Sequence, residues 1–247
     1  MSIERAAELI AASHHAVALT GAGVSAESGI PTFRGAGGLW TKYDPVKVSS
    51  IDSFLADPAS YWMVSKERGA VALAARPNAG HKALAEMEAA GHLVALVTQN
   101  TDGLHRDAGS SHVIELHGSG RTVECLECGR REPRADVQAR LGVEMPPRCP
   151  DCGSTFLKPT VVLFGEPMPA DAINEAFELA RQADVMLVVG SSLVVYPAAD
   201  VPIVALRSGA RLIVVNAEPT PFDRFAEVVI HGRSGEVLPQ IASLIDA

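Results

Sequence analysis

The sequence has few cysteines, no excess of basic residues and no long hydrophobic run, and each of these absences narrows its possible function. The formal net charge is −8 over 247 residues. This charge argues against a nucleic-acid clamp, which needs a basic face to replace the counterions of the phosphates. No apolar run is long enough for a membrane span, and the N-terminal residues lack a signal-peptide pattern. We therefore expect a cytoplasmic protein, monomeric, that binds neither nucleic acid nor membrane.

The four cysteines form two close pairs, Cys125 with Cys128 and Cys149 with Cys152. Two residues separate the members of each pair, and a glycine follows each pair, as in the turns of a four-thiolate zinc site. Four free thiols or two redox pairs are the alternatives, and they fit this spacing less well. Because four protein thiolates leave the metal no open position, the expected Zn²⁺ ion is structural.

Short apolar runs alternate with helical sequence over much of the chain. Residues 16–19, 93–97, 185–189 and 212–215 are rich in Val, Leu and Ile without polar alternation, which is typical of strands buried on both faces. Helical sequence fills residues 79–90 and 170–181, where Asp171 is a candidate cap. This alternation predicts an α/β fold with a doubly wound, mainly parallel, Rossmann-like sheet.

Two segments interrupt this alternation and are interpreted as insertions. One has a glycine-rich opening followed by helical sequence, and the other contains all four cysteines and several prolines. We predict a single domain over residues 1–247. Its large Rossmann-like part comprises residues 1–34, 79–122 and 159–247, and its small part comprises a helical insertion, 35–78, and a zinc ribbon, 123–158.

A glycine-containing turn, residues 20–25, follows the first predicted strand. Glycines at such a turn let the backbone approach a pyrophosphate. Ala26 stands where the usual dinucleotide fingerprint has a further glycine, so an ordinary tight turn remains an alternative. The next loop contains Phe33 and Arg34 among glycine and proline, which suggests a lid over a bound nucleotide.

Polar residues cluster where two strands are expected to end, at residues 98–105 and 116–119. Ligands of such folds bind at the carboxyl ends of the strands. His117 is the better candidate for a base, because a glycine follows it and the cysteine segment comes next. The role of His105 stays open. We interpret His14, His15 and His231 as structural.

Together these motifs resemble the sirtuins, the NAD-dependent protein lysine deacylases, and in particular a short bacterial or archaeal member. They occur in family order over nearly the whole chain. The matching segments are residues 21–35, 99–102, 116–118, the two cysteine pairs, 164–166, 190–193 and 215–216.

The resemblance implies that NAD is a co-substrate, with its pyrophosphate on the turn at residues 21–23. The expected cofactor contacts are Gly21, Ala22, Gly23, Glu27, Thr32, Phe33, Arg34, Trp40, Gln99, Asn100, Thr101, Asp102, Gly190, Ser191, Ser192, Asn216, Ala217, Glu218 and Ser234.

The resemblance also implies catalytic roles for Asn100, Asp102 and His117. Asp102 would bond the nicotinamide amide, and Asn100 would order the ribose and a water. Nicotinamide leaves as the acyl oxygen attacks the ribose, and His117 then acts as general base. The products would be free lysine, nicotinamide and O-acyl-ADP-ribose.

The acylated lysine would lie in an extended protein segment that pairs with edges of this chain. The expected substrate contacts are Val162, Phe164, Gly165, Glu166, Val194, Val195, Ser65 and Arg68.

The chain departs from the family pattern at several positions. Thr101 replaces the usual Ile, with an effect on the nicotinamide pocket that the sequence does not define, and Ser191 replaces a Thr. Ser65 stands where sirtuins that remove succinyl or malonyl groups have a Tyr, although their Arg is present as Arg68. We expect acetyl and other uncharged acyl groups as substrates, with desuccinylation or demalonylation through Arg68 as an alternative.

Three other functions share the predicted fold. A protein ADP-ribosyltransferase would use the same NAD cleavage with another nucleophile. A non-catalytic NAD or ADP-ribose sensor is disfavoured because Asn100, Asp102 and His117 are all present. A hydride-transferring dehydrogenase would produce NADH.

Overall fold

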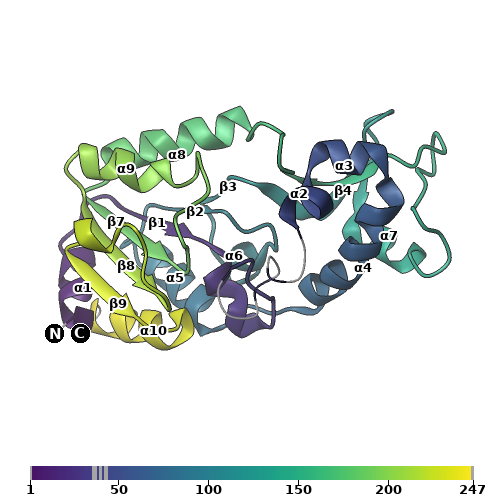
Figure 1. Ribbon diagram of the computed structural model, residues 1–247. Helices are drawn as coiled ribbons and strands as arrows, with labels where there is room; N and C mark the ends of the chain where they lie inside the picture. The colour runs from purple at the N-terminus through teal and green to yellow at the C-terminus, as the bar shows by residue number, and fades with distance from the viewer. Residues whose placement is uncertain (1, 35–37, 39–40, 42–43, 246–247) are drawn as a thin grey trace.

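A computed structural model describes residues 2–34, 38, 41 and 44–245. Among these residues, six strands form one sheet in which every neighbouring pair is parallel. Their order across the sheet is β3-β2-β1-β7-β8-β9 (Figure 1). The bounds are β1 Ala16–Thr20, β2 Ala95–Thr98, β3 Val113–Glu115, β7 Val185–Val189, β8 Arg211–Asn216 and β9 Val228–His231. The predicted doubly wound parallel sheet is confirmed.

Helices cover both faces of this sheet, which explains why its central strands show no polar alternation. In β1, Ala16 and Ala18 belong to the core on one face, whereas Val17 and Leu19 belong to the core on the other. Successive strand side chains point to opposite faces, so both sets must be apolar. Figure 1 shows α8 and α9 on one side of the strands and α1 and α10 on the other. The helices are α1 Ser2–Ala11, α5 Ala79–Ala89, α8 Ala170–Gln182, α9 Asp200–Arg207 and α10 Ser234–Ile245.

The predicted cap of α8 is wrong. The helix begins at Ala170, its N-cap residue is Pro169, and no side chain caps it. Asp171 therefore lies inside the first turn, two residues after the N-cap position, where its carboxylate cannot serve as the cap. It can still interact favourably with the positive end of the helix dipole.

A second, antiparallel sheet has the order β5-β4-β6, formed by β4 Gly118–Cys125, β5 Arg131–Pro133 and β6 Leu157–Val161. Its core joins Phe54 and Trp62 to Val123 and Leu157, so helical sequence before β2 packs on the cysteine segment. The remaining elements are α2 Pro45–Ser49, α3 Ile51–Ala56, α4 Pro58–Ala74, α6 Leu104–Asp107, α7 Arg134–Arg140, η1 Ala22–Ser28 and η3 Asp223–Phe225. The division of the chain into a large and a small part stays a prediction.

Within the described ranges, no helix is both long enough and apolar enough to cross a membrane.

Candidate functional site

A cavity of about 1480 Å³ lies at the carboxyl ends of β1, β2, β7 and β8. Pockets for single small ligands occupy about 300–1,000 Å³, so this cavity has room for a dinucleotide together with a substrate side chain. Residues of α4 and the segment after β6 complete its wall. The position at the strand ends agrees with the general rule for ligands of open α/β sheets.

The structure brings nearly all of the predicted site residues to this cavity. Every described candidate for catalysis or for binding the cofactor or the substrate lines it except Val194, whose side chain is exposed. Trp40 lies outside the described residues.

The glycine turn packs backbone to backbone against the end of β7. The amide of Gly23 donates to the carbonyl of Gly190 at 2.8 Å, and a Cβ on Gly23 would lie 2.7 Å from the Cα of Gly190. Gly190 itself has a φ of +61°, a region that favours glycine. Both glycines are therefore required by packing as well as by the predicted approach of a phosphate. The following segment is a 3₁₀ helix, η1.

Asn100 and Asp102 share a partner in Ser25. Asn100, at 7% exposure, donates from Nδ2 to the Gly21 carbonyl and to the Ser25 hydroxyl oxygen, both at 3.1 Å. The Ser25 hydroxyl donates to Asp102 Oδ2 at 2.7 Å, and the Leu104 amide donates to Oδ1 at 2.9 Å. Both carboxylate oxygens of Asp102 are thus held by donors, which fixes this side chain at the cavity wall.

Ser25 and His81 were not predicted as site residues. The backbone amide of Asn78 lies 3.4 Å from His81 Nδ1 and can only donate, so the ring proton is on Nε2, which faces Ser25 Oγ at 3.3 Å. Burial lowers the pKa of His81, so the neutral ring is favoured. The sequence signal was Asn78 three residues before His81, a helix-capping pattern that carries no functional meaning without the fold.

His117 follows β3 and precedes β4, and its ring lines the cavity. Nδ1 lies 2.8 Å from the carbonyl oxygen of Gln99. A carbonyl can only accept, so Nδ1 carries the proton and Nε2 has the lone pair that a general base needs. Burial lowers the pKa of His117, against an opposing effect of the Gln99 hydrogen bond.

Several predicted cofactor contacts also hold the cavity together. Gln99 donates to the Ser191 hydroxyl at 2.9 Å and so joins the ends of β2 and β7. Glu27 accepts the Gly235 amide at 2.7 Å in the first turn of α10. Asn216 donates to the carbonyl of Glu218 at 2.6 Å. These contacts place the side chains without assigning their roles toward a ligand.

The other end of the cavity contains Ser65, Arg68 and an arginine that was not predicted, Arg134. The guanidinium carbon of Arg68 lies 5.4 Å from the ring centre of Phe33. Arg134, from α7, is buried and donates to the Ser65 hydroxyl at 3.1 Å. A Cβ on Gly69 would lie 2.0 Å from Arg134 Nη2. This glycine therefore gives Arg134 its space, a long-range relation that no sequence motif showed.

The segment after β6 has few free amides for pairing with a substrate. The amides of Val162, Leu163 and Phe164 donate to the His117 carbonyl, Glu166 Oε2 and the Ser49 carbonyl at 2.9, 2.8 and 2.9 Å. Main-chain pairing of a substrate here would therefore depend on carbonyl groups, or on the neighbouring segment 193–196.

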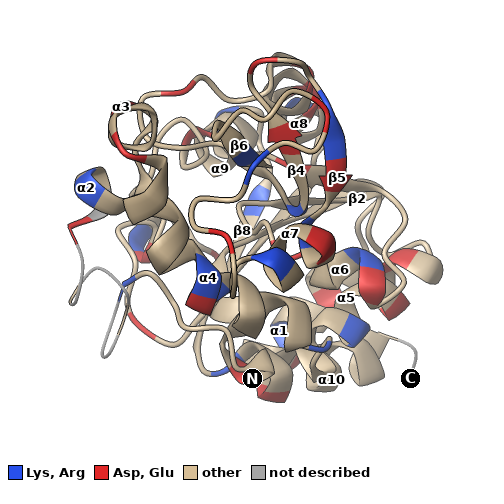
Figure 2. Ribbon diagram, turned by 90° about the vertical axis from the view of Figure 1, so that its right-hand side faces the viewer, with Lys and Arg blue, Asp and Glu red and all other residues tan. Residues whose placement is uncertain are grey.

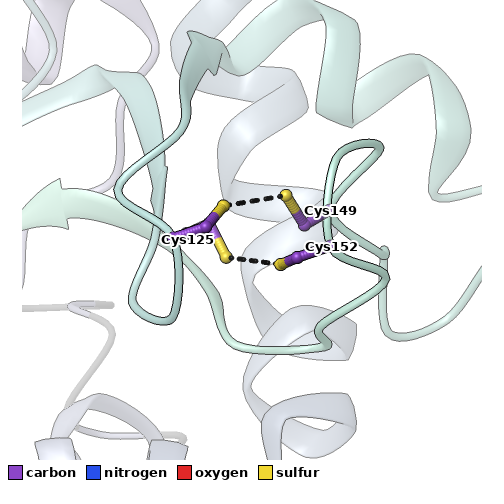
Figure 3. A group of neighbouring side chains, drawn as sticks. Cys125, Cys149 and Cys152 are labelled. Carbon is purple, nitrogen blue, oxygen red and sulfur yellow. Dashed lines mark hydrogen bonds between the residues drawn. The ribbon is translucent and has the colours of Figure 1, made fainter.

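The four cysteine sulfurs converge from two turns (Figure 3). Cys125 Sγ lies 3.6 Å from Cys152 Sγ, and Cys128 Sγ lies 3.6 Å from Cys149 Sγ, with all four within 4.8 Å of one another. Tetrahedral zinc with bonds of about 2.3 Å requires sulfurs about 3.8 Å apart. The residues present therefore fit one Zn²⁺ ion.

A dinucleotide-sized cavity at the switch region of a parallel sheet, next to a four-cysteine cluster, defines a nucleotide-binding α/β protein with a structural metal module. The sequence profile of the Sir2 family matches residues 21–197. The chain belongs to the Sir2 family.

Individual relatives are similar over almost their whole length. An Archaeoglobus fulgidus protein named NAD-dependent protein deacylase 2 is 51% identical over 239 residues, which cover 97% of this chain and 94% of the relative. A structure described as the basis for the mechanism and regulation of Sir2 enzymes has 49% identity and a TM-score of 0.93, with 99% and 98% coverage. A Sir2 variant with deacetylated p53 peptide and 3′-O-acetyl ADP ribose has 40% identity and a TM-score of 0.95, with 98% of both chains covered.

Proposed function

We infer that this chain is an NAD-dependent protein lysine deacylase that releases nicotinamide and O-acyl-ADP-ribose. The observation that carries the proposal is one cavity that joins the tautomerically fixed His117 to Asn100 and Asp102. The function of the similar proteins supports it. Bound NAD would supply an electrophilic ribose carbon and nicotinamide as leaving group.

We propose separate roles for the three central side chains. Asp102, fixed by Ser25 and the Leu104 amide, binds the nicotinamide amide. Asn100 orders the ribose and a nearby water. His117 takes a proton from a ribose hydroxyl through Nε2, because Nδ1 is already bonded to the Gln99 carbonyl. The residues predicted at the glycine turn, the lid and the strand ends hold the remainder of NAD, and the four cysteines hold Zn²⁺ as a structural ion only.

For the second substrate we propose acylated lysines in extended protein segments, with acetyl and other uncharged acyl groups preferred. Ser65, which stands in place of the Tyr, accepts from Arg134, and Arg68 lies against the Phe33 ring, so position 65 offers no tyrosine hydroxyl that could hold a carboxylate together with Arg68. Desuccinylation through Arg68 is the alternative outcome.

We also propose a monomer in the cytoplasm that binds neither nucleic acid nor membrane. Zinc-binding thiolates suit a reducing compartment. In the view of Figure 2, acidic and basic segments are interspersed over the helices and strands, and the net charge is −8.

Incubation with NAD and acetylated, succinylated and long-chain acylated peptides tests the activity. We expect deacetylated peptide and nicotinamide in equal amounts, with succinyl peptide at least about tenfold slower, a difference of about 1.4 kcal/mol in the barrier. ADP-ribose attached to protein would indicate a transferase instead, and NADH a dehydrogenase. Arg68→Ala is the control for acyl choice. If this variant lost desuccinylation but kept deacetylation, Arg68 would be established as the residue that binds the carboxylate of a succinyl group.

The pH dependence of kcat/KM tests the role of His117. A general base must be neutral, and burial holds the pKa of His117 below its ordinary value of 6.5. The rate should therefore stay high as the pH falls through 6.5 and decline only at lower pH, where the ring becomes protonated. An acid limb centred above 6.5 would contradict this assignment.

A further inference from the structure

His105 is a buried histidine next to the site that the proposed chemistry does not use. It lies on α6 at 2% exposure and does not line the large cavity. Its Nε2 lies 2.9 Å from the Thr20 hydroxyl oxygen at the end of β1. A buried polar side chain needs such a partner, because an unmade hydrogen bond in the interior is costly.

The contact continues as a chain of hydrogen bonds from His105 to Asn100. Thr20 and Thr98 face each other in the register of β1 and β2, at 0% and 2% exposure, and their hydroxyl oxygens are 2.8 Å apart. The backbone amide of Asn100 donates to the Thr98 hydroxyl oxygen at 3.0 Å. Three buried bonds thus connect the imidazole to the main chain of a proposed catalytic residue.

The direction of donation along this series of hydrogen bonds follows from its donors. The Thr20 hydroxyl donates to Thr98, so the Thr20 oxygen accepts from His105 Nε2–H. His105 Nδ1 then carries no proton, and it has no hydrogen-bond partner among the described residues. The opposite tautomer would bury an N–H without an acceptor. Burial, and next the neighbouring His81, lower the pKa of His105 to about 3, so the ring remains a neutral donor at ordinary pH.

The peptide that joins Gln99 to Asn100 is held at both of its polar groups, because its carbonyl accepts from His117 Nδ1 and its N–H donates to the Thr98 hydroxyl oxygen. The Asn100 side chain donates to the Gly21 carbonyl and to Ser25. Loss of the Thr98 bond would release one side of this peptide, and a rotation of the peptide would turn the carboxamide away from the cavity. Displacement of a positioning group by about an ångström can cost a large factor in rate.

We propose that His105 is a positioning residue for Asn100, acting through Thr20 and Thr98. The proposal rests on the catalytic role inferred for Asn100. It gives a function to a histidine whose role the sequence left open, and it assigns the two buried threonines to the site and not only to the sheet.

The test compares four variants with wild type: His105→Leu, His105→Gln, Thr20→Val and Thr98→Val. His105→Leu and Thr20→Val interrupt the series of hydrogen bonds at different points. Each should lower kcat about tenfold, which corresponds to about 1.4 kcal/mol in the activation barrier, with little change in the KM for NAD. His105→Gln keeps a side-chain N–H donor and should recover kcat to within about threefold of wild type. The thermal midpoint of each variant is measured in parallel, and Thr20→Val keeps the test usable if His105→Leu does not fold.

A double variant separates positioning from general destabilisation. If His105 acts through the threonines, His105→Leu in a Thr98→Val background should lower kcat no further, because Thr98→Val has already interrupted the series of hydrogen bonds. Losses that multiply to about a hundredfold would overturn the proposal, as would an unchanged kcat in His105→Leu. The control is Ile10→Val, which changes a core residue of α1. Ile10 does not line the cavity, so this variant should leave kcat unchanged.

Hydrogen exchange of the Asn100 amide gives a readout that does not need activity. Exchange should accelerate in His105→Leu and Thr20→Val but not in Ile10→Val. If wild type shows no deacylation, the proposed function fails while exchange still tests the link to Asn100. If wild type is active and neither kcat nor exchange responds to His105→Leu, only the positioning role fails.

Discussion

A His117→Ala variant is expected to bind NAD about as tightly as wild type and to deacylate about 10²–10⁴-fold more slowly, the range for removal of a general base. The reason lies in the geometry of His117. Its Nδ1 proton is committed to the Gln99 carbonyl, so Nε2 is the atom left to take a proton. The measurement is single-turnover deacylation with saturating NAD, together with an NAD titration.

His14→Ala is a matched control, because His14 is exposed on the loop between α1 and β1 and does not line the cavity. It should leave both the rate and the NAD affinity unchanged. Unchanged turnover in His117→Ala would contradict the assignment of the base. A loss of NAD affinity as large as the loss of rate would show that His117 serves binding instead.

Removal of zinc is expected to abolish activity by unfolding the four-cysteine module. Structural zinc contributes about 10–16 kcal/mol in zinc-finger peptides. Here Cys125 and Cys149 belong to the same buried cluster as Phe54 and Trp62. The disturbance should therefore reach α4, whose residues line the cavity.

Trp62 provides the measurement. It is fully buried, and its indole N–H donates to the Leu157 carbonyl at 2.9 Å. On chelation its fluorescence should shift to the red as activity disappears, and added Zn²⁺ should restore both. A reductant without chelator is the control and should change neither. Activity that survived complete zinc removal with an intact fold would contradict a structural role.

The parts of the fold that the sequence predicted are those determined locally. Strands buried on both faces leave uninterrupted apolar runs, and a four-thiolate site requires two tight turns of fixed spacing. The prediction that Asp171 caps α8 was wrong because the helix begins at Ala170, two residues earlier than an Asp171 cap requires. Helix boundaries depend on the chain path at Pro169, which is set by packing.

The residues missed at the site share another cause. Ser25, His81 and Arg134 acquire their significance from partners 56 to 77 residues away, such as Asp102 for Ser25 and Ser65 for Arg134. No spacing rule connects them before the fold is known. Once the fold is known, a buried hydroxyl or guanidinium directs attention to its partner, because buried polar groups are paired.

Mass analysis of the nucleotide product is the most direct test of the central claim, that this chain transfers an acyl group from lysine to ADP-ribose. With NAD and an acetylated peptide, we expect O-acetyl-ADP-ribose in amounts equal to the deacetylated peptide, from the first turnovers. Free acetate with NAD unconsumed, or ADP-ribose bound to the peptide, would contradict it.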